Sequence, residues 1–245
     1  MAERDNKLRF RSSSATHVGA VRKLNEDSLL DNPSVGLWAV ADGAGGHSAG
    51  DYASQTLVAG LSRIAPQQSA MDLLTAVRQQ IEIANANLRA YAANEGIDMT
   101  ATTVAVLLCF GQHYAAVWAG DSRVYLLRDG QLRLVTRDHS AVQELVDAGA
   151  ITPEEALRHP HRNVVTRAVG AAGTVDVDMV QDRLGPNDIF LLCSDGLGKV
   201  VSDEEIAAAL LSMAADAVPD YLVEMALARS VPDNISIVVV ECLDS

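Results

Sequence analysis

The chain has 245 residues, which fits one large domain or two small ones. Its formal net charge of −13 argues against nucleic-acid binding, which needs a basic face. Its hydrophobic fraction of 49% is typical of a globular protein, and no apolar run reaches the roughly 18–20 residues that would span a bilayer. The polar start MAERDNKLRF has no signal-peptide core, so we expect a cytoplasmic protein with no membrane insertion and no nucleic-acid partner.

The first third of the chain changes from strand-like to helical patterns. Residues 8–19 are typical of a strand, residues 21–28 of a loop or short strand, and residues 36–46 of a buried strand that runs into a glycine cluster. Apolar residues then recur at helical spacing over 48–64 and 70–92, which predicts two amphipathic helices.

The rest of the chain returns to strands and then alternates irregularly. Short strands separated by Gly and Asp turns, among them a hairpin turn around Asp129-Gly130, are predicted over 100–110, 113–121, 122–130 and 131–136. Short helices are expected over 139–148 and 153–158, followed by a strand at 188–196, helices at 203–212 and 217–229, and a last strand at 235–243. This order differs from regular β-α-β alternation and predicts an α+β fold of antiparallel sheets with helices packed outside.

The three cysteines do not form a recognisable framework. Cys109, Cys193 and Cys242 each lie in an apolar, strand-like run. An odd number without paired spacing argues against disulfides and against a zinc site. We expect all three to be buried as small hydrophobic residues.

Several aspartates follow or precede buried strands, each beside a glycine or a turn. Asp42, Asp121 and Asp195 come directly after apolar runs, Asp233 stands just before the last strand, and Glu26 and Asp27 form an acidic pair. A carboxylate at the end of a buried strand is costly unless a partner compensates it. Oxygen ligands of this kind suit Mg²⁺ or Mn²⁺, whereas Asp-Gly is also a common turn pair. The spacing alone leaves both interpretations open.

Five of these stretches, in this order, resemble the metal-dependent PPM or PP2C class of protein phosphatases, in particular its small bacterial stand-alone members. They are Thr16–Ser28 (THVGAVRKLNEDS), Ala41–Gly50 (ADGAGGHSAG), Gly120–Arg123 (GDSR), Ser194–Leu197 (SDGL) and Asp233–Ser236 (DNIS). The resemblance covers essentially the whole chain, residues 1–245, as a single domain. It implies a four-layer αββα sandwich of two antiparallel β-sheets flanked by helix pairs.

The resemblance also implies roles for individual residues. Asp42 is expected to bridge two Mn²⁺ or Mg²⁺ ions, with the Gly43 carbonyl, Asp195 and Asp233 as further ligands. Glu26 and Asp27 would act near the metals, partly through water, and Asp121 with Asp195 would hold a possible third ion. Arg22 is expected to bind the substrate phosphate.

Elementary chemistry agrees with these roles. Two cations bridged by a carboxylate lower the pKa of a bound water, which gives a hydroxide that attacks phosphorus without a phosphoenzyme. Arginine grips a phosphate in a bidentate fork. The expected function is therefore hydrolysis of phosphoserine and phosphothreonine in a phosphorylated protein, opposite a bacterial Ser/Thr kinase, by a monomer.

Some features stay open in the sequence. Animal relatives carry a histidine where this chain has Ala44, and a role for His47 as general acid is not carried over. Residues 147–170 match the family's substrate-side flap in place and contain a group of basic residues. Arg123 is expected to pair with a nearby carboxylate. The rival hypotheses are a binding-only pseudophosphatase, another two-metal hydrolase such as a nuclease, and a regulatory sensing module.

Overall fold

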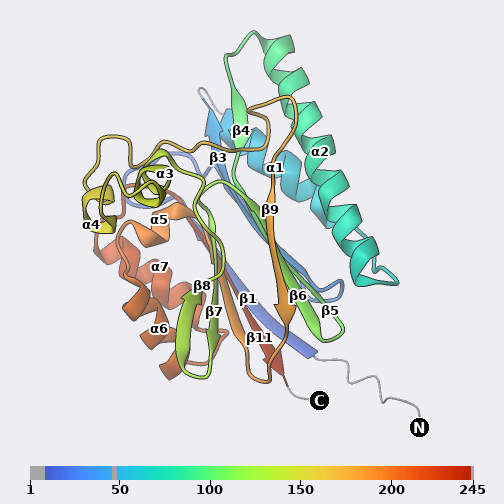
Figure 1. Ribbon diagram of the computed structural model, residues 1–245, viewed down its shortest axis with the longest axis vertical. Helices are drawn as coiled ribbons and strands as arrows, with labels where there is room; N and C mark the ends of the chain where they lie inside the picture. The colour runs from blue at the N-terminus through green and yellow to red at the C-terminus, as the bar shows by residue number, and fades with distance from the viewer. Residues whose placement is uncertain (1–8, 46–48, 244–245) are drawn as a thin grey trace.

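The computed structural model describes residues 9–45 and 49–243, which form two stacked antiparallel sheets (Figure 1). The five-stranded sheet has the order β1 (Arg9–His17), β11 (Ile235–Leu243), β10 (Ile189–Cys193), β7 (Arg123–Arg128), β8 (Gln131–Leu134). The six-stranded sheet has the order β2 (Asp27–Asn32), β3 (Leu37–Gly45), β5 (Val104–Phe110), β6 (His113–Ala119), β9 (Asp178–Arg183), with β4 (Thr100–Thr102) paired to the end of β3.

Two helix pairs cover the outer faces of the sheets. Helices α1 (Ala49–Ser62) and α2 (Ala70–Glu95) share a core with β3, β5 and β6, and α6 (Asp203–Ser212) and α7 (Val218–Ala228) share one with β7, β10 and β11. Three shorter helices, α3 (Ala141–Asp147), α4 (Pro153–Ala156) and α5 (Asp195–Gly198), lie in the connections. The αββα sandwich expected from the sequence is therefore confirmed.

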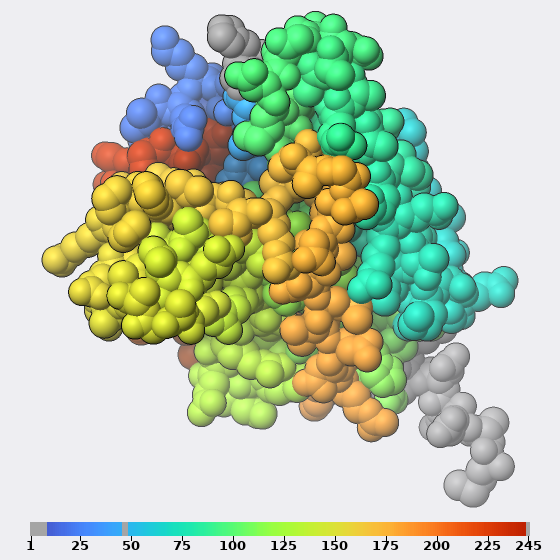
Figure 2. Space-filling view, turned by 45° about the horizontal axis from the view of Figure 1, so that its top comes forward, coloured from blue at the N-terminus to red at the C-terminus, as the bar shows by residue number. Residues whose placement is uncertain are grey.

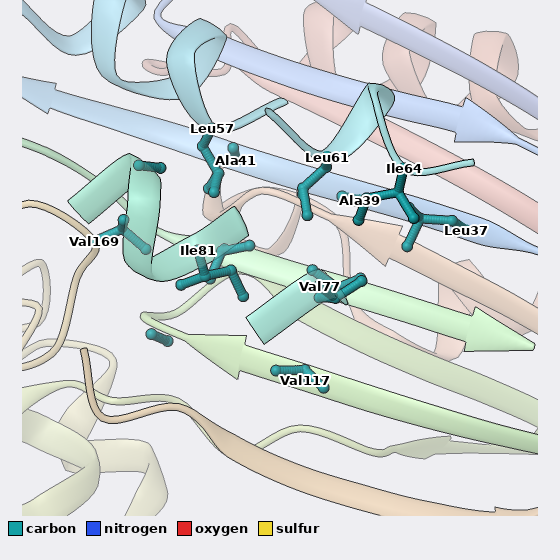
Figure 3. Packing of buried hydrophobic residues seen from close by; sticks show 14 of the residues in the cluster. Leu37, Ala39, Ala41, Leu57, Leu61, Ile64, Val77, Ile81, Val117 and Val169 are labelled. Atoms are coloured by element: carbon teal, nitrogen blue, oxygen red, sulfur yellow. The ribbon is translucent and has the colours of Figure 1, made fainter. Parts of the chain in front are cut away.

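The alternating pattern of β3 shows how the layers are built. Leu37, Ala39 and Ala41 face α1 and α2, where Leu57 and Val77 cover them (Figure 3). Trp38 and Val40 point the other way and pack between the two sheets. Successive strand residues face opposite sides, so a strand buried on both faces reads as one continuous apolar run.

Local signals fix several boundaries. Helix α2 begins after Ser69, whose side chain accepts a hydrogen bond from the Asp72 amide, and ends at Gly96 in the left-handed conformation. The hairpin turn expected around Asp129-Gly130 is present, with positive φ angles of 52° and 76° at the two central residues.

Some strands of the structure differ from those expected from the sequence. Strand β9 was not predicted, because it is an edge strand whose charged residues are largely exposed. The segment 21–28 is expected from the sequence to be a loop or short strand. The strand β2, at the other edge of that sheet, has six residues and begins only at Asp27. The expected strand 100–110 is interrupted at Thr103, and the strand expected over 188–196 ends at Cys193 because α5 begins at Asp195.

Among the described residues, no helix has the length and apolar character needed to cross a membrane.

A buried ion pair ties two strands of the five-stranded sheet together and gives a test of the fold. Asp188 is fully buried and accepts hydrogen bonds from Arg128 Nε (2.7 Å) and Nη2 (2.6 Å) and from the Gly185 amide (2.7 Å). Replacing Arg128 with Ala leaves this carboxylate buried without its cation, so we expect a loss of about 3–5 kcal/mol in the free energy of unfolding by urea. The exposed pair Arg11–Glu241 is the control, and Arg11→Ala should cost at most about 1 kcal/mol. Equal effects of the two variants would contradict this assignment.

Candidate metal centre

The acidic residues singled out in the sequence gather at one end of the two sheets. Asp27 and Asp42 lie opposite each other where β2 begins and β3 nears its end. Asp195 follows β10, Asp233 precedes β11, and Asp121 lies in the turn from β6 to β7. Because neighbouring strands are antiparallel, the end of one strand adjoins the start of the next, which brings these five residues together. Figure 2 turns this end toward the reader and shows the surface recessed between the N-terminal loop in blue and the 150–165 segment in yellow.

Asn234 fastens the N-terminal loop to this end of the five-stranded sheet. Its side-chain Nδ2 donates to the carbonyls of Val18 (2.9 Å) and Leu24 (3.0 Å), and its Oδ1 accepts from the Glu26 amide (2.8 Å). One side chain therefore satisfies three backbone groups of the segment that carries Arg22, Glu26 and Asp27. Side-chain bonds of this kind replace the backbone pairing that a loop lacks.

Ser194 links the two sheets across the site. Its hydroxyl donates to Asp27 Oδ2 (2.7 Å) and accepts from the Ser236 amide (3.0 Å). The second oxygen of Asp27, Oδ1, is buried and has no hydrogen-bond partner among the described residues.

Asp42 and Asp121 are positioned through the backbone around them. The Asp42 amide donates to Thr103 Oγ1 (3.0 Å), and the Thr103 amide donates to the Asp42 carbonyl (2.8 Å). The Gly120 amide donates to His139 Nδ1 (3.2 Å), and the His139 amide donates to the Gly120 carbonyl (2.9 Å). A bond from His139 Nε2 to Asp178 Oδ2 (3.1 Å) fixes the ring that holds the Asp121 loop.

The expected pairing of Arg123 is confirmed. Its Nε and Nη2 donate to the two oxygens of Asp138 (3.0 and 2.7 Å), which closes the same loop from the other side.

The clustering of carboxylates raises their pKa values. Burial, followed by the charges of Asp27, Asp195, Asp121 and Asp233, raises the pKa of Asp42 well above its usual range. Burial raises the pKa of Asp27 to about 7 against the hydrogen bonds of Ser194 and Ser236, and it raises that of Asp121 to about 7 with help from the charge of Asp195. Each carboxylate is therefore costly to ionise beside the others, and a bound cation is the natural compensation.

Two basic side chains already contact part of the cluster. Lys199 Nζ lies 2.6 Å from Asp195 Oδ2 and 2.8 Å from Asp233 Oδ2. Arg22 Nε lies 2.9 Å from Asp233 Oδ1. Although burial opposes it, Lys199 and Arg22 together lower the pKa of Asp233.

Glycines allow the backbone of this end to pack closely. A Cβ on Gly43 would clash with the Gly50 carbonyl oxygen, and one on Gly50 would lie 2.9 Å from the Gly43 carbonyl oxygen and also meet the Glu26 carboxylate. Both positions therefore require glycine for Glu26 and the Gly43 carbonyl to sit beside the start of α1.

The donor set suits a hard divalent cation. All the candidate groups are oxygens, and buried Asp27 Oδ1 and Asp195 Oδ1 lack hydrogen-bond partners within the described ranges. In the described part of the chain, however, no three His, Cys, Asp or Glu side chains are arranged closely enough to enclose an ion as they stand. The residues fit a metal in chemistry, and Lys199 contacts one oxygen of Asp195 and one of Asp233 in this arrangement.

The acidic positions singled out in the sequence all lie at this end of the sheets, whereas some residues that contact them were not predicted. Asn234 and Ser194 lay inside quoted motifs without a stated role, and Lys199 was missed although its i,i+4 spacing from Asp195 on a helix could have indicated an ion pair. His47 lies outside the described residues.

Comparisons with known proteins identify the family of the chain. The family model described as "Protein phosphatase 2C" matches residues 16–229. Among curated proteins, the chain is 38% identical over 97% of its length to the serine/threonine protein phosphatase PstP of Mycobacterium tuberculosis, of which it covers 46%. It is 37% identical over 92% of its length to a putative protein phosphatase 2C-type of Streptococcus pyogenes, of which it covers 94%.

Solved structures show the same fold. PppA, described as a key regulatory component of T6SS in Pseudomonas aeruginosa, superposes with a TM-score of 0.90 at 42% identity over 96% of this chain and 98% of that one. The catalytic domain of PstP in complex with two manganese ions gives a TM-score of 0.89 at 37% identity over 97% of this chain and 100% of that one.

The two-sheet sandwich is thus shared with solved structures of serine/threonine protein phosphatases. The chain belongs to the protein phosphatase 2C family. It spans about half the length of the mycobacterial relatives that it matches.

The role of Asn234 can be tested by removing its amide. Asn234→Ala leaves the Val18 and Leu24 carbonyls and the Glu26 amide without their partner, so we expect a loss of about 2–4 kcal/mol in the free energy of unfolding. Hydrogen exchange should show the Glu26 amide losing protection. Asn25→Ala is the control, since the Asn25 side chain has bonds only to Thr16 and Asp27 among the described contacts, and an unprotected Glu26 amide in both variants would count against the assignment.

The raised pKa values predict an unusual pH dependence for metal-stripped protein. In the unfolded chain an aspartate loses its proton at a pKa of about 3.9. In the folded protein Asp27 and Asp121 keep their protons up to a pKa of about 7. Stability is therefore greatest below the unfolded value and is lost as the pH rises through about 7, by at least about 2 kcal/mol. Denaturation in urea with chelator between pH 4 and pH 8 measures this slope. Asp27→Asn should flatten it, and an unchanged slope in that variant would show that Asp27 ionises normally.

Proposed function

We propose that the protein is a metal-dependent phosphatase that hydrolyses phosphoserine and phosphothreonine in phosphorylated proteins. The observation that carries this proposal is the convergence of Asp27, Asp42, Asp121, Asp195 and Asp233 at one end of the sheets, where each charge raises the cost of the next. The names of the relatives support it, since PstP and the Listeria stp proteins are serine/threonine phosphatases.

In this proposal the centre takes two Mn²⁺ or Mg²⁺ ions, with a third possible. Asp42 would contact both ions, and the Gly43 carbonyl, Asp195 and Asp233 would be further ligands. Glu26 and Asp27 would act partly through water, and Asp121 with Asp195 would hold the third ion. The manganese ions in the PstP catalytic domain support the choice of metal.

The bound metals would supply a water of lowered pKa and would neutralise charge on the phosphoryl group. Arg22, which lies beside Asp233 with its side chain half exposed, would hold the substrate phosphate through its planar fork. The oxygen of water would bond to phosphorus as the bond to the serine or threonine oxygen breaks, and a proton from the water would pass to that leaving oxygen to give the hydroxyl and inorganic phosphate.

Neither Cys193 nor Ser194, which directly precede Asp195, is activated as a nucleophile in this scheme. Burial raises the pKa of Cys193 to about 12, so this residue stays a thiol at neutral pH. The Ser194 hydroxyl is buried and engaged by Asp27 and Ser236. Both facts support direct hydrolysis without a phosphoenzyme.

The role of the flap, the cellular location, the oligomeric state and the opposing kinase belong to the same proposal. The flap, residues 147–170, carries exposed Arg158 and Arg162 on an otherwise acidic chain, which suits an approaching phosphoprotein. We place the protein in the cytoplasm, as a single-domain monomer that opposes a Ser/Thr kinase. Size-exclusion chromatography with light scattering tests the monomer.

Hydrolysis of a phosphothreonine peptide by metal-stripped protein, with Mn²⁺ added back, tests the activity. We expect activity only with metal, and a fall in kcat of at least about 10³-fold, or ~4 kcal/mol of barrier, for Asp42→Asn and for Asp195→Asn. Asp220→Asn, an exposed change in the first turn of α7, should leave kcat unchanged. A wild type that stays inert with both Mn²⁺ and Mg²⁺ on several phosphopeptides would instead point to a fold kept for binding.

A further inference from the structure

Lys199 contacts two of the carboxylates of the cluster. It follows α5, one helical turn after Asp195, so its side chain returns over the residue that begins the helix. Its ammonium bridges Asp195 Oδ2 (2.6 Å) and Asp233 Oδ2 (2.8 Å), and its side chain is only 23% exposed. The Lys199 ammonium therefore contacts one oxygen of each of two carboxylates that are proposed above as metal ligands.

Asp233 has no oxygen left free by these contacts. Its Oδ1 accepts from Arg22 Nε (2.9 Å) and from the Asn234 amide (3.0 Å), while its Oδ2 accepts from Lys199 (2.8 Å) and from Arg22 Nη2 (3.1 Å). Asp195 differs, since its Oδ1 is buried without a hydrogen-bond partner among the described residues and its Oδ2 is held by Lys199. A metal ion that binds both carboxylates must displace at least one donor from Asp233.

The charge of Lys199 also reaches Asp121. Among the influences on the pKa of Asp121, burial and the charges of Asp195 and Asp138 raise it, and the charge of Lys199 lowers it. The ammonium is thus near all three aspartates on this side of the cluster. The ammonium and a divalent ion that contacts the same carboxylates would repel each other strongly in this partly buried place, because little water screens the two charges.

We propose that Lys199 is an intramolecular competitor for the metal ions, which exchanges with a divalent cation on the carboxylates of Asp195 and Asp233. It neutralises the cluster when metal is scarce and weakens metal binding when metal is present. The chain then requires a higher free metal concentration than the carboxylates alone would need. This inference rests on the proposed function, since it takes Asp195 and Asp233 as ligands.

Calorimetric titration of the metal-stripped full chain with Mn²⁺ tests the competition directly. Lys199→Met removes the ammonium and keeps most of the apolar stem, so we expect Mn²⁺ to bind at least about 10-fold more tightly than to the wild type. Lys199→Arg retains the charge and should stay within about 3-fold of the wild type. Lys23→Met is the matched control, because it removes the same charge from an exposed position in the N-terminal loop and leaves the ion pairs of Asp195 and Asp233 intact.

Thermal melting gives a second readout that does not depend on activity. With chelator, Lys199→Met should melt at a lower temperature than the wild type, because Asp195 loses its cation and Asp233 keeps only Arg22. Saturating Mn²⁺ should raise its melting temperature by more than it raises that of the wild type. If Lys199→Met does not fold in chelator, Lys199→Gln, which keeps a hydrogen-bond donor without the charge, is expected to show the same tighter binding.

The outcomes separate the two proposals. Binding to Lys199→Met or Lys199→Gln that is equal to or weaker than binding to the wild type overturns the competition, and so does an equal gain in Lys23→Met. A wild type that binds no Mn²⁺ overturns the proposed metal centre itself. Normal binding by the wild type with no change on removing Lys199 leaves the metal centre standing and rejects only the role of the lysine.

Discussion

The structure depends on keeping several like-charged carboxylates together in a poorly hydrated place. Asp27 and Asp42 face each other across two strands, and the charges of Asp195, Asp121 and Asp233 add to the cost of ionising Asp42. Such a cluster is unstable unless cations and hydrogen-bond donors compensate it. Ser194 supplies a donor from the opposite sheet, and Lys199 and Arg22 supply positive charge. The electrostatic cost of the cluster therefore favours positive charge beside these carboxylates.

The apolar cores of the two-sheet sandwich offset the electrostatic cost of the carboxylate cluster. The central core of the sandwich, which includes Trp38, Phe190 and Leu192, and the helix-covered cores on either side provide the apolar burial that stabilises the chain. The carboxylates take no part in those cores and lie where strands begin or end. Backbone groups at the strand ends are held by side chains such as Asn234 and Thr103, so the loops are fixed as firmly as the strands that they join.

The elements that the sequence predicted well are those with a strong local signal. The buried strands, the two long helices and the Asp129-Gly130 turn each follow from periodicity or turn chemistry. Strand β9 escaped because its exposed, charged residues resemble a loop and its pairing with β6 is formed across more than fifty residues of chain. The break at Thr103 escaped for a similar reason, since it comes from bonds between Thr103 and Asp42, on a distant strand.

The sequence by itself determined the family, the layered α+β architecture and the acidic positions Asp27, Asp42, Asp121, Asp195 and Asp233, because motifs and strand ends are local properties of the chain. Only the tertiary structure decided which donors each carboxylate meets. Ser194 reaches Asp27 across 167 residues of sequence, and Lys199 reaches Asp233 across 34. Hydrogen bonds and charge interactions act over a few ångströms in space, whatever the separation along the chain, and the antiparallel pairing of the strands sets those distances.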